Sequence, residues 1–236
     1  MVKFAVLFLL AATTLLKADT QTPASYSGEF VIPVNYRYLL SKPEAYSSNK
    51  RKKWPLVIFL HGSGERGTDL ELVKKHGPPK LIATGQKFPA IIASLQCEPD
   101  HLWNPHAIKA VTNHLIRTMR VDPKRVYLTG LSMGGFGTWD TAFEYPKTYA
   151  AIAPICGGAG VRWVTAQILK DMPCWIFHGD KDGAVPIENS QKIYDALKEI
   201  NAPVKFTIYP GVGHDSWTQT YDKPEFWKWL FEQKKP

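Results

Sequence analysis

Cysteine is scarce in this 236-residue sequence, and long apolar segments are absent from it. The three cysteines are too few, and odd in number, for a disulfide-rich scaffold, and no pair has the C-x-x-C spacing of a metal site. No apolar run reaches the roughly 20 residues that a membrane-spanning helix needs. Apolar residues make up 44% and charged residues 21% of the chain, which excludes a disordered chain and a polytopic membrane protein.

The N-terminal segment has the pattern of an export signal. One early charge, Lys3, is followed by about 13 apolar or small residues ending at Leu16, the charged-then-apolar order of a signal peptide. We expect residues 1–18 to be removed by cleavage after Ala18, and an uncleaved anchor is the alternative. On the first interpretation, residues 19–236 form one domain that is secreted or periplasmic and has no stable membrane insertion.

The chain is basic, with a formal net charge of +8 at pH 7. A basic surface can attract nucleic acid or anionic polymers. The excess is nevertheless spread along the chain, apart from Lys50–Lys53 just before an apolar run, where a solvated loop is the simpler interpretation. We therefore expect no nucleic-acid partner.

Short apolar runs alternate with longer amphipathic segments from residue 30 onward. This alternation predicts an α/β fold, a mostly parallel central sheet with helices on both faces. The predicted strands are residues 56–60, 90–95, 126–129, 149–155, 174–177 and 205–209, and residues 30–39 begin an antiparallel edge pair. The predicted helices are residues 104–119, 134–144, 161–169, 188–200 and 224–233.

A G-x-S-x-G motif stands at residues 130–134, directly after a predicted strand and before a predicted helix. In that context the motif is typical of a nucleophile elbow, in which a strand turns into a helix within a few residues and exposes the central serine. The flanking glycines leave room for the tight turn, and the helix N-terminus supplies N–H donors for an oxyanion. The sequence predicts Ser132 as a nucleophile, and an ordinary serine in a glycine-rich turn is the alternative.

Acidic and histidine side chains follow two later predicted strands. Asp180 and Asp182 come after the strand 174–177, and His214 lies in the glycine-rich loop after the strand 205–209. The carboxyl ends of parallel strands lie at one edge of a sheet, and the order serine, acid, histidine is that of hydrolases with this elbow. We predict His214 as the general base and Asp182 as the acid that orients it, with Asp180 as the alternative acid.

The loop after the strand 56–60 is expected to complete an oxyanion hole. The N–H of Ser63 is paired in this prediction with the N–H of Met133, and Gly64 is the substitute for Ser63. The candidate substrate contacts are Gly64, Gln96, Trp103 and Trp217. Packing in the core is an equally good interpretation of Gln96 and of both tryptophans.

Two cysteines end predicted strands near the same edge of the sheet. Cys97 follows the strand 90–95, and Cys156 follows the strand 149–155. A disulfide between them is one option in an oxidising compartment, and two free thiols are the other. The third, Cys174, opens a strand and is expected in the core.

Together these segments resemble the α/β-hydrolase superfamily. Most similar are its small secreted or periplasmic serine esterases, the phospholipase/carboxylesterase group and carbohydrate esterase family 1, which includes feruloyl and acetylxylan esterases. The resemblance rests on residues 60–67, 94–99 with Trp103, 130–135, 178–186 and 211–217. It implies a triad of Ser132, Asp182 and His214, an oxyanion hole near Ser63 and Met133, and no metal or organic cofactor. Gly183 and Ala184 depart from the commoner pattern, in which a proline or a bulkier residue stands in the acid loop.

The resemblance also implies a type of reaction. Lid domains are commonly inserted after the strand 149–155 in this fold, and only residues 157–173 precede the next strand, so we expect an open site with no large lid. An open site favours hydrolysis of short-chain esters, or of esters linked to a polysaccharide, through an acyl-enzyme. A serine peptidase of the same superfamily and a non-catalytic carbohydrate-binding protein are the alternatives, and the oligomeric state stays open.

Overall fold

Residues 25–28 and 34–236 are described by the computed structural model. The predicted export signal at residues 1–18 and the start of the predicted edge segment, residues 30–33, lie outside them. The chain divides into two units, residues 1–32 and 33–236. In the first unit only residues 25–28 are described, and they form neither helix nor strand. Every element named below lies in the second unit.

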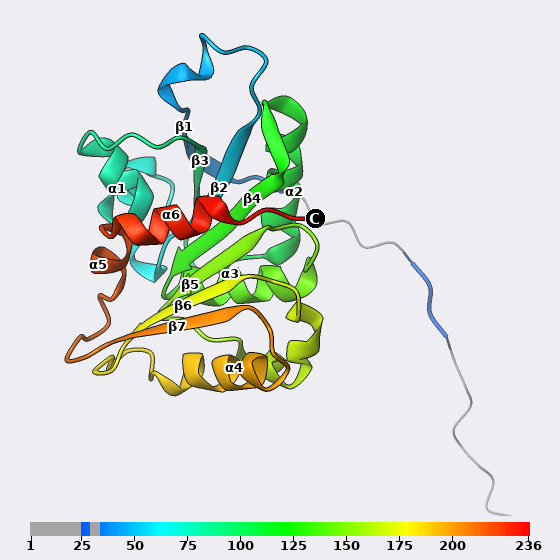
Figure 1. The fold of residues 1–236 in the computed structure, drawn as a ribbon, viewed down its shortest axis with the longest axis vertical. Coiled ribbons are helices and arrows are strands. Elements are labelled where there is room, and N and C mark those ends of the chain that lie inside the picture. Colours follow the sequence, from blue (N-terminus) through cyan, green and yellow to red (C-terminus); the bar gives the residue numbers. More distant parts are fainter. Residues whose placement is uncertain (1–24, 29–33) are drawn as a thin grey trace, which may run out of the picture. The chain divides into compact units, whose positions relative to one another are not determined.

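The strands of the second unit form one seven-stranded sheet (Figure 1). They are β1 (Arg37–Ser41), β2 (Trp54–Leu60), β3 (Ile91–Gln96), β4 (Val121–Leu131), β5 (Ala151–Ile155), β6 (Cys174–Gly179) and β7 (Val204–Tyr209). Their order across the sheet is β1-β3-β2-β4-β5-β6-β7, in which β1 runs antiparallel to β3 and all other neighbours are parallel. The predicted mostly parallel sheet with an antiparallel N-terminal edge is confirmed.

Apolar side chains alternate between the two faces of the central strands. In β2, Leu56 and Ile58 belong to one apolar core, and Val57 and Phe59 belong to the other. A parallel strand that is covered on both faces needs a continuous apolar run. All seven residues of β2 are accordingly apolar and buried.

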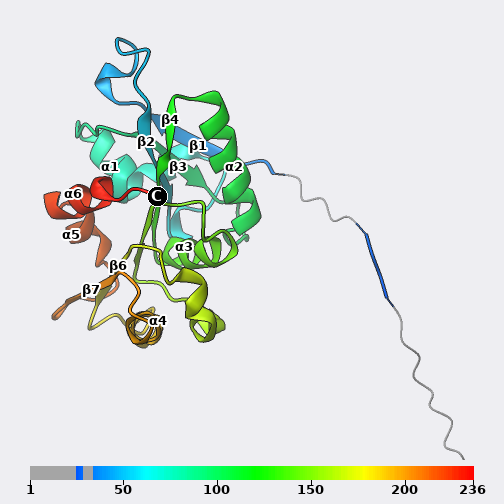
Figure 2. The same ribbon diagram turned by 45° about the vertical axis from the view of Figure 1, so that its right-hand side comes forward.

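Helices cover both faces of this sheet (Figures 1 and 2). One core contains residues of α2 (Pro105–Thr118), α3 (Met133–Glu144), the 3-10 helix η4 (Gly160–Leu169) and α4 (Glu188–Glu199). The opposite core packs against α1 (Gly77–Ala83), α5 (Trp217–Tyr221) and α6 (Pro224–Glu232). Three shorter 3-10 helices lie in loops: η1 (Glu44–Tyr46), η2 (Ser63–Glu65) and η3 (Leu70–Lys75). No helix within the described ranges has both the length and the apolar character to span a bilayer.

The predicted helices are all present, but one differs in type and two others were not predicted. The segment predicted as a helix at 161–169 consists of two short 3-10 stretches that meet at a kink, where the backbone of Thr165 is not helical. Helix α1 carries Pro78 and Pro79 in its first turn, a composition that resembles a loop. Helix α5 has five residues, too few to show a helical period.

The strand order creates a switch point beside β2. The chain passes from β2 to β3 on one side of it and then to β4 on its other side. In open α/β sheets, a crevice forms at the carboxyl ends of the strands where the order reverses in this way. Ser132 directly follows β4 at this edge, and the loops after β6 and β7 reach the same edge.

Candidate active site

Ser132 occupies a sharp turn between β4 and α3. Its backbone has φ 52° and ψ −117°, a conformation that L side chains rarely adopt and that costs about 1–3 kcal/mol. The N–H of Ser132 donates to the carbonyl of Ile155 at 2.9 Å, which ties the turn to the end of β5. The strain holds the hydroxyl at the carboxyl edge of the sheet, as the motif predicts.

The two motif glycines are required because backbone passes against them. A Cβ added to Gly134 would lie 2.1 Å from the carbonyl oxygen of Leu60 at the end of β2. A Cβ at Gly130 would lie 2.4 Å from the carbonyl oxygen of Gly134 and 2.8 Å from that of Leu60. Neither contact can be relieved by a rotamer change, since both neighbours are main chain. Only glycine lets β2, β4 and α3 approach this closely.

The structure brings the three predicted triad residues together. The Nε2 atom of His214 lies 2.9 Å from the Oγ of Ser132, and its Nδ1 atom lies 2.7 Å from the Oδ2 of Asp182. The serine follows β4, the aspartate follows β6 and the histidine follows β7. One imidazole therefore bridges a hydroxyl and a carboxylate from loops far apart in the sequence.

The carboxylate of Asp182 is buried and held from several sides. Its Oδ1 accepts the backbone N–H groups of Ala184 and Val185, each at 2.9 Å. Burial alone would raise the pKa of Asp182, but the hydrogen bonds from His214, Val185 and Ala184 together lower it below its usual value. The alternative acid, Asp180, instead accepts the N–H of Gly211 at 2.6 Å in an exposed turn.

The predicted oxyanion donors flank Ser132. Ser63 is the first residue of η2 and Met133 the first residue of α3, positions whose N–H groups have no acceptor within their own helix. Both residues line the same cavity as Ser132. Gly64, the predicted substitute and substrate contact, is exposed and is not part of that lining. Ser63 and Met133 therefore border the same cavity as Ser132.

Side-chain contacts from behind fix the loop of Ser63. Glu65 is 3% exposed and its Oε2 accepts the N–H of Gly62 at 3.1 Å. The Nε of Arg66 donates to the carbonyl of Ser63 at 3.1 Å. The amide of Gln96 donates to the carbonyl of Asp69 at 2.6 Å, and the residue is 2% exposed. The predicted substrate contact by Gln96 is therefore wrong: its side chain points into the protein and braces the loop.

The two candidate tryptophans have different surroundings. Trp103 lines the cavity of Ser132, and its Nε1 donates to the carbonyl of His61 at 3.1 Å. Trp217 is buried outside that lining and meets the His214 ring edge-on, with ring centroids 5.1 Å apart and an interplanar angle of 90°. For Trp217 the packing alternative holds, because its indole supports the imidazole instead of facing the cavity.

The cavity beside Ser132 has a volume of about 440 Å³. It lies at the first turn of α3, and its lining is Ser63, Arg66, Leu102, Trp103, Ser132, Met133, Phe136, Gly137 and Asp140. Asp140 forms an ion pair with Arg162 of η4 at 3.3 Å. Burial raises the pKa of Asp140, and the positive charge of Arg162 opposes this effect. The site thus combines an apolar wall with one guanidinium and one carboxyl group.

A larger cavity of about 730 Å³ lies at the opposite edge of the sheet. Lysine and proline side chains around the starts of β4 and β5 line it, among them Lys124, Lys147 and Lys235. None of the predicted site residues contributes to this lining. Ser132 and the predicted residues around it border the smaller cavity instead.

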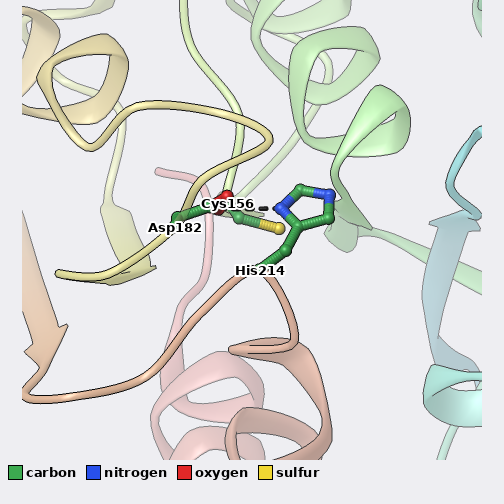
Figure 3. A group of neighbouring side chains, drawn as sticks. All are labelled: Cys156, Asp182 and His214. Atoms are coloured by element: carbon green, nitrogen blue, oxygen red, sulfur yellow. Dashed lines mark hydrogen bonds and ion pairs between the residues drawn. The ribbon is translucent and has the colours of Figure 1, made fainter.

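Cys156 lies beside the histidine–aspartate pair (Figure 3). Ligand atoms of Cys156, Asp182 and His214 lie within 4.8 Å of one another, and they are the one such group of three found among the described residues. Burial raises the pKa of Cys156 to about 12, so its thiol keeps its proton. A cation here would have to displace that proton and break the 2.7 Å bond between Asp182 and His214. The cluster therefore fits a serine site better than a metal centre.

The three cysteines are free thiols, so the possible Cys97–Cys156 disulfide is not formed. Cys97 follows β3 and Cys156 follows β5, and β2 and β4 lie between these strands. Neighbouring strands are about 4.8 Å apart, which separates the two positions by roughly 14 Å. A disulfide requires Cα atoms within about 7 Å.

His61 directly follows β2 and is fully buried. Its Nδ1 donates to the carbonyl of Gly62 at 2.6 Å, and its Nε2 accepts the N–H of Cys97 at 3.0 Å. Burial lowers its pKa to about 4. An unfolded histidine has a pKa of about 6.5, so between these values the unfolded chain binds a proton that the folded chain does not.

This difference predicts an acid-sensitive fold. The free energy of unfolding should fall by up to about 3 kcal/mol through His61 as the pH drops from about 6.5 to about 4. His61→Gln should remove that part of the pH dependence, whereas His114→Gln on the exposed surface should keep the parental dependence. Urea unfolding at several pH values measures both, and equal pH dependence in the two variants would contradict the assignment.

His178, which sequence reasoning did not single out, also contacts the site. It is fully buried, and its Nε2 lies 3.2 Å from the Oδ2 of Asp182. Its position at the end of β6, four residues before the acid, was the available signal. That signal does not reveal the contact, because the acid loop must first fold back over the strand end.

A serine, an imidazole and a carboxylate at the carboxyl edge of a mostly parallel sheet with helices on both faces define an α/β-hydrolase. Within that class the chain belongs to the dienelactone hydrolase family, which it matches over residues 96–225.

Several similar proteins are esterases. The crystal structure of a thermostable esterase is 36% identical with a TM-score of 0.74, and the match covers 85% of this chain and 60% of that one. The structure of a ferulic acid esterase is 17% identical with a TM-score of 0.62, and the match covers 83% of this chain and 93% of that one. At this identity the match shows a similar fold and nothing more. An uncharacterized secreted protein of Arthroderma benhamiae is 24% identical, in a match that covers 85% of this chain but only 26% of that protein.

Proposed function

We propose that the chain is a secreted serine carboxylic-ester hydrolase in which Ser132 is the nucleophile, His214 the base and Asp182 its orienting acid. The observation that carries the proposal is the continuous contact from Oγ to Nε2 at 2.9 Å and from Nδ1 to Oδ2 at 2.7 Å. A serine hydroxyl is a weak nucleophile unless a base accepts its proton, and this geometry meets that need. The esterases among the similar proteins support the same reaction.

The proposed reaction has two halves. The Oγ of Ser132 attacks the ester carbonyl carbon while its proton passes to Nε2 of His214, and the carbonyl oxygen becomes an oxyanion facing the N–H groups of Ser63 and Met133. The C–O bond to the alcohol then breaks, and His214 returns the proton to the leaving oxygen. Water then hydrolyses the acyl-enzyme by the same steps. Its proton goes to His214 while its oxygen bonds to the carbonyl carbon. The bond between that carbon and the Oγ of Ser132 then breaks, and Oγ takes the proton from His214.

Asp182 remains ionised throughout these steps. It accepts the Nδ1–H of His214, which fixes the tautomer with a free Nε2 and stabilises the imidazolium once it forms. The two N–H groups of Ala184 and Val185 hold the other carboxylate oxygen. Gly183 and Ala184, which depart from the commoner family pattern, therefore still leave the carboxylate anchored through backbone.

We propose short-chain esters, or acetyl and feruloyl-type esters on a polysaccharide, as substrates. The 440 Å³ cavity accommodates a small acyl or aromatic group against Leu102, Trp103 and Phe136. Between β5 and β6 the described chain forms no more than η4, so a substrate that projects from a polymer has access. No cofactor has a role in this mechanism.

We also propose export, with cleavage after Ala18 and residues 19–236 as one catalytic domain. Support comes from the signal-like pattern of residues 1–18 and from a relative named as a secreted protein. The N-terminal residue of the exported chain checks this part of the proposal.

A panel of esters tests the proposed activity. p-Nitrophenyl esters from acetyl to decanoyl, acetylated and feruloylated xylan, and a p-nitroanilide should be compared by kcat/KM. We expect short acyl groups to exceed decanoyl by about tenfold or more, because the cavity limits chain length, and the anilide to react far more slowly. A faster anilide would favour a peptidase, and no turnover of any ester together with carbohydrate binding would favour the non-catalytic alternative.

A further inference from the structure

We propose that His178 is a positioning residue for the reaction, a second histidine that holds the carboxylate of Asp182 toward His214. The inference rests on the proposed function, since it concerns the same triad. His178 is the last residue but one of β6, and it is not part of the lining of the cavity that Ser132 lines. It therefore acts through Asp182 and not on the substrate.

Each ring nitrogen of His178 has a buried partner. The Nε2 atom lies 2.9 Å from the carbonyl oxygen of Val185 and 3.2 Å from the Oδ2 of Asp182. The Nδ1 atom lies 2.7 Å from the Oγ of Ser190, which is 1% exposed. The side chains of His178 and Asp182 are both 0% exposed, so water does not compete for these contacts.

These partners fix the tautomer of His178. A carbonyl oxygen and an ionised carboxylate accept hydrogen bonds and cannot donate them, so Nε2 must carry a hydrogen. Burial lowers the pKa of His178, which favours the neutral ring with Nδ1 as an acceptor. The hydroxyl of Ser190, which lies 2.7 Å from Nδ1, donates to the carbonyl oxygen of Gly157 at 2.8 Å. The hydroxyl can share its hydrogen between these two acceptors.

The consequence is that two imidazole nitrogens lie beside the Oδ2 of Asp182. The Nδ1 of His214 is hydrogen-bonded to it at 2.7 Å, and the Nε2 of His178, whose hydrogen bond is to Val185, lies 3.2 Å from it as a second, weaker electrostatic contact. With Oδ1 held by Ala184 and Val185, the carboxylate cannot rotate without losing a hydrogen bond. Because the contact of Oδ2 with His178 is the longer of the two, the stronger interaction of Oδ2 is with His214, the proposed base.

The contacts of His178 also connect the acid loop to the nucleophile helix. Ser190 on α4 reaches the carbonyl of Gly157, and Gly157 packs against the first turn of α3. A Cβ at Gly157 would lie 2.5 Å from the carbonyl carbon of Gly135 and 2.7 Å from the backbone nitrogen of Phe136. His178 therefore connects the loop of Asp182, through Ser190 and Gly157, to α3, the helix that begins next to Ser132.

Other titratable groups around the pair have separate roles. Cys156 faces Asp182 as a protonated thiol, and Asp215 is the neighbour of His214. His76 lies behind Trp217, with ring centroids 5.3 Å apart, and faces Glu65 at 3.7 Å. Among the described residues, His178 and His214 are the two histidines within 4.0 Å of the Asp182 carboxylate.

Two amide substitutions separate positioning from simple packing. The amide of His178→Gln reaches the place of Nε2 and can keep the contacts with Val185 and Asp182, whereas the shorter amide of His178→Asn reaches only the place of Nδ1. With p-nitrophenyl acetate, we expect His178→Asn to lose about 10- to 100-fold in kcat with KM nearly unchanged, because the base is misoriented and the cavity is intact. His178→Gln should regain most of that loss.

Thermal unfolding and proton NMR accompany these kinetics. The low-field resonance of the His214 Nδ1 proton should shift in His178→Asn and return toward the parental position in His178→Gln. Equal kcat for the two folded variants, or an unshifted resonance in His178→Asn, would overturn the positioning role. Ser132→Ala, measured alongside, distinguishes the two proposals: if it is as active as the parent, the proposed function fails and not only the role of His178.

Discussion

Ser132→Ala is expected to lower kcat for p-nitrophenyl acetate by about 10⁴-fold or more while the protein stays folded. The reaction needs the bond between Oγ and the acyl carbon, and no other hydroxyl in the described residues contacts the His214 imidazole. Alanine keeps the Cβ, the backbone conformation at φ 52° and the N–H bond to Ile155, so the turn has no reason to rearrange. Any rate of the variant that exceeds uncatalysed hydrolysis in water should come from the oxyanion donors.

A matched control uses Ser48→Ala, an exposed serine outside the site, which should keep the parental rate. A fluorophosphonate probe provides an independent measurement, since it should label the parent and Ser48→Ala but not Ser132→Ala. Parental turnover by Ser132→Ala would refute the nucleophile assignment. Labelling that persists in this variant would locate the reactive group at another residue.

The sequence predicted those parts of the site that depend on chain order and backbone geometry. The elbow glycines, Ser132 and the later Asp182 and His214 could be placed, because each follows an apolar run that reads as a parallel strand, and the ends of parallel strands meet. The antiparallel strand pair at the edge of the sheet and the helices on both of its faces were predicted from the alternation of short apolar runs with amphipathic segments. These features depend on periodicity and not on the direction of single side chains.

Side-chain direction at strand ends could not be predicted. Gln96 ends β3 and was expected at the substrate, but its amide turns toward the carbonyl of Asp69. Trp217 packs on the His214 ring because α5, a helix too short to recognise from its sequence, begins there. The contacts of His178 could not be predicted because its partner Val185 is brought near only by the folded conformation of the loop of Asp182. Each case depends on contacts between segments that no single segment encodes.

Gly134→Ala is expected to destabilise the protein by about 3 kcal/mol or more, a large share of the roughly 5–15 kcal/mol that stabilises a folded domain. Helix propensity alone predicts the opposite, because Gly134 lies in the first turn of α3 and alanine is favoured over glycine in helices by about 1 kcal/mol. The steric effect should win, since the new Cβ would lie 2.1 Å from the carbonyl oxygen and 2.6 Å from the carbonyl carbon of Leu60. Relief requires moving α3 away from β2 and would also displace the Met133 N–H.

Gly183→Ala is the appropriate comparison, because a Cβ at Gly183 meets no atom within 4 Å and its φ is not in the left-handed region. That variant should be as stable as the parent or more stable by about 0.4–1 kcal/mol, through the smaller entropy of its unfolded chain. Urea unfolding followed by circular dichroism measures both. If Gly134→Ala unfolds at the parental midpoint, the close approach of β2 to α3 is wrong, and the proposed alignment of Ser132 with His214 loses its structural support.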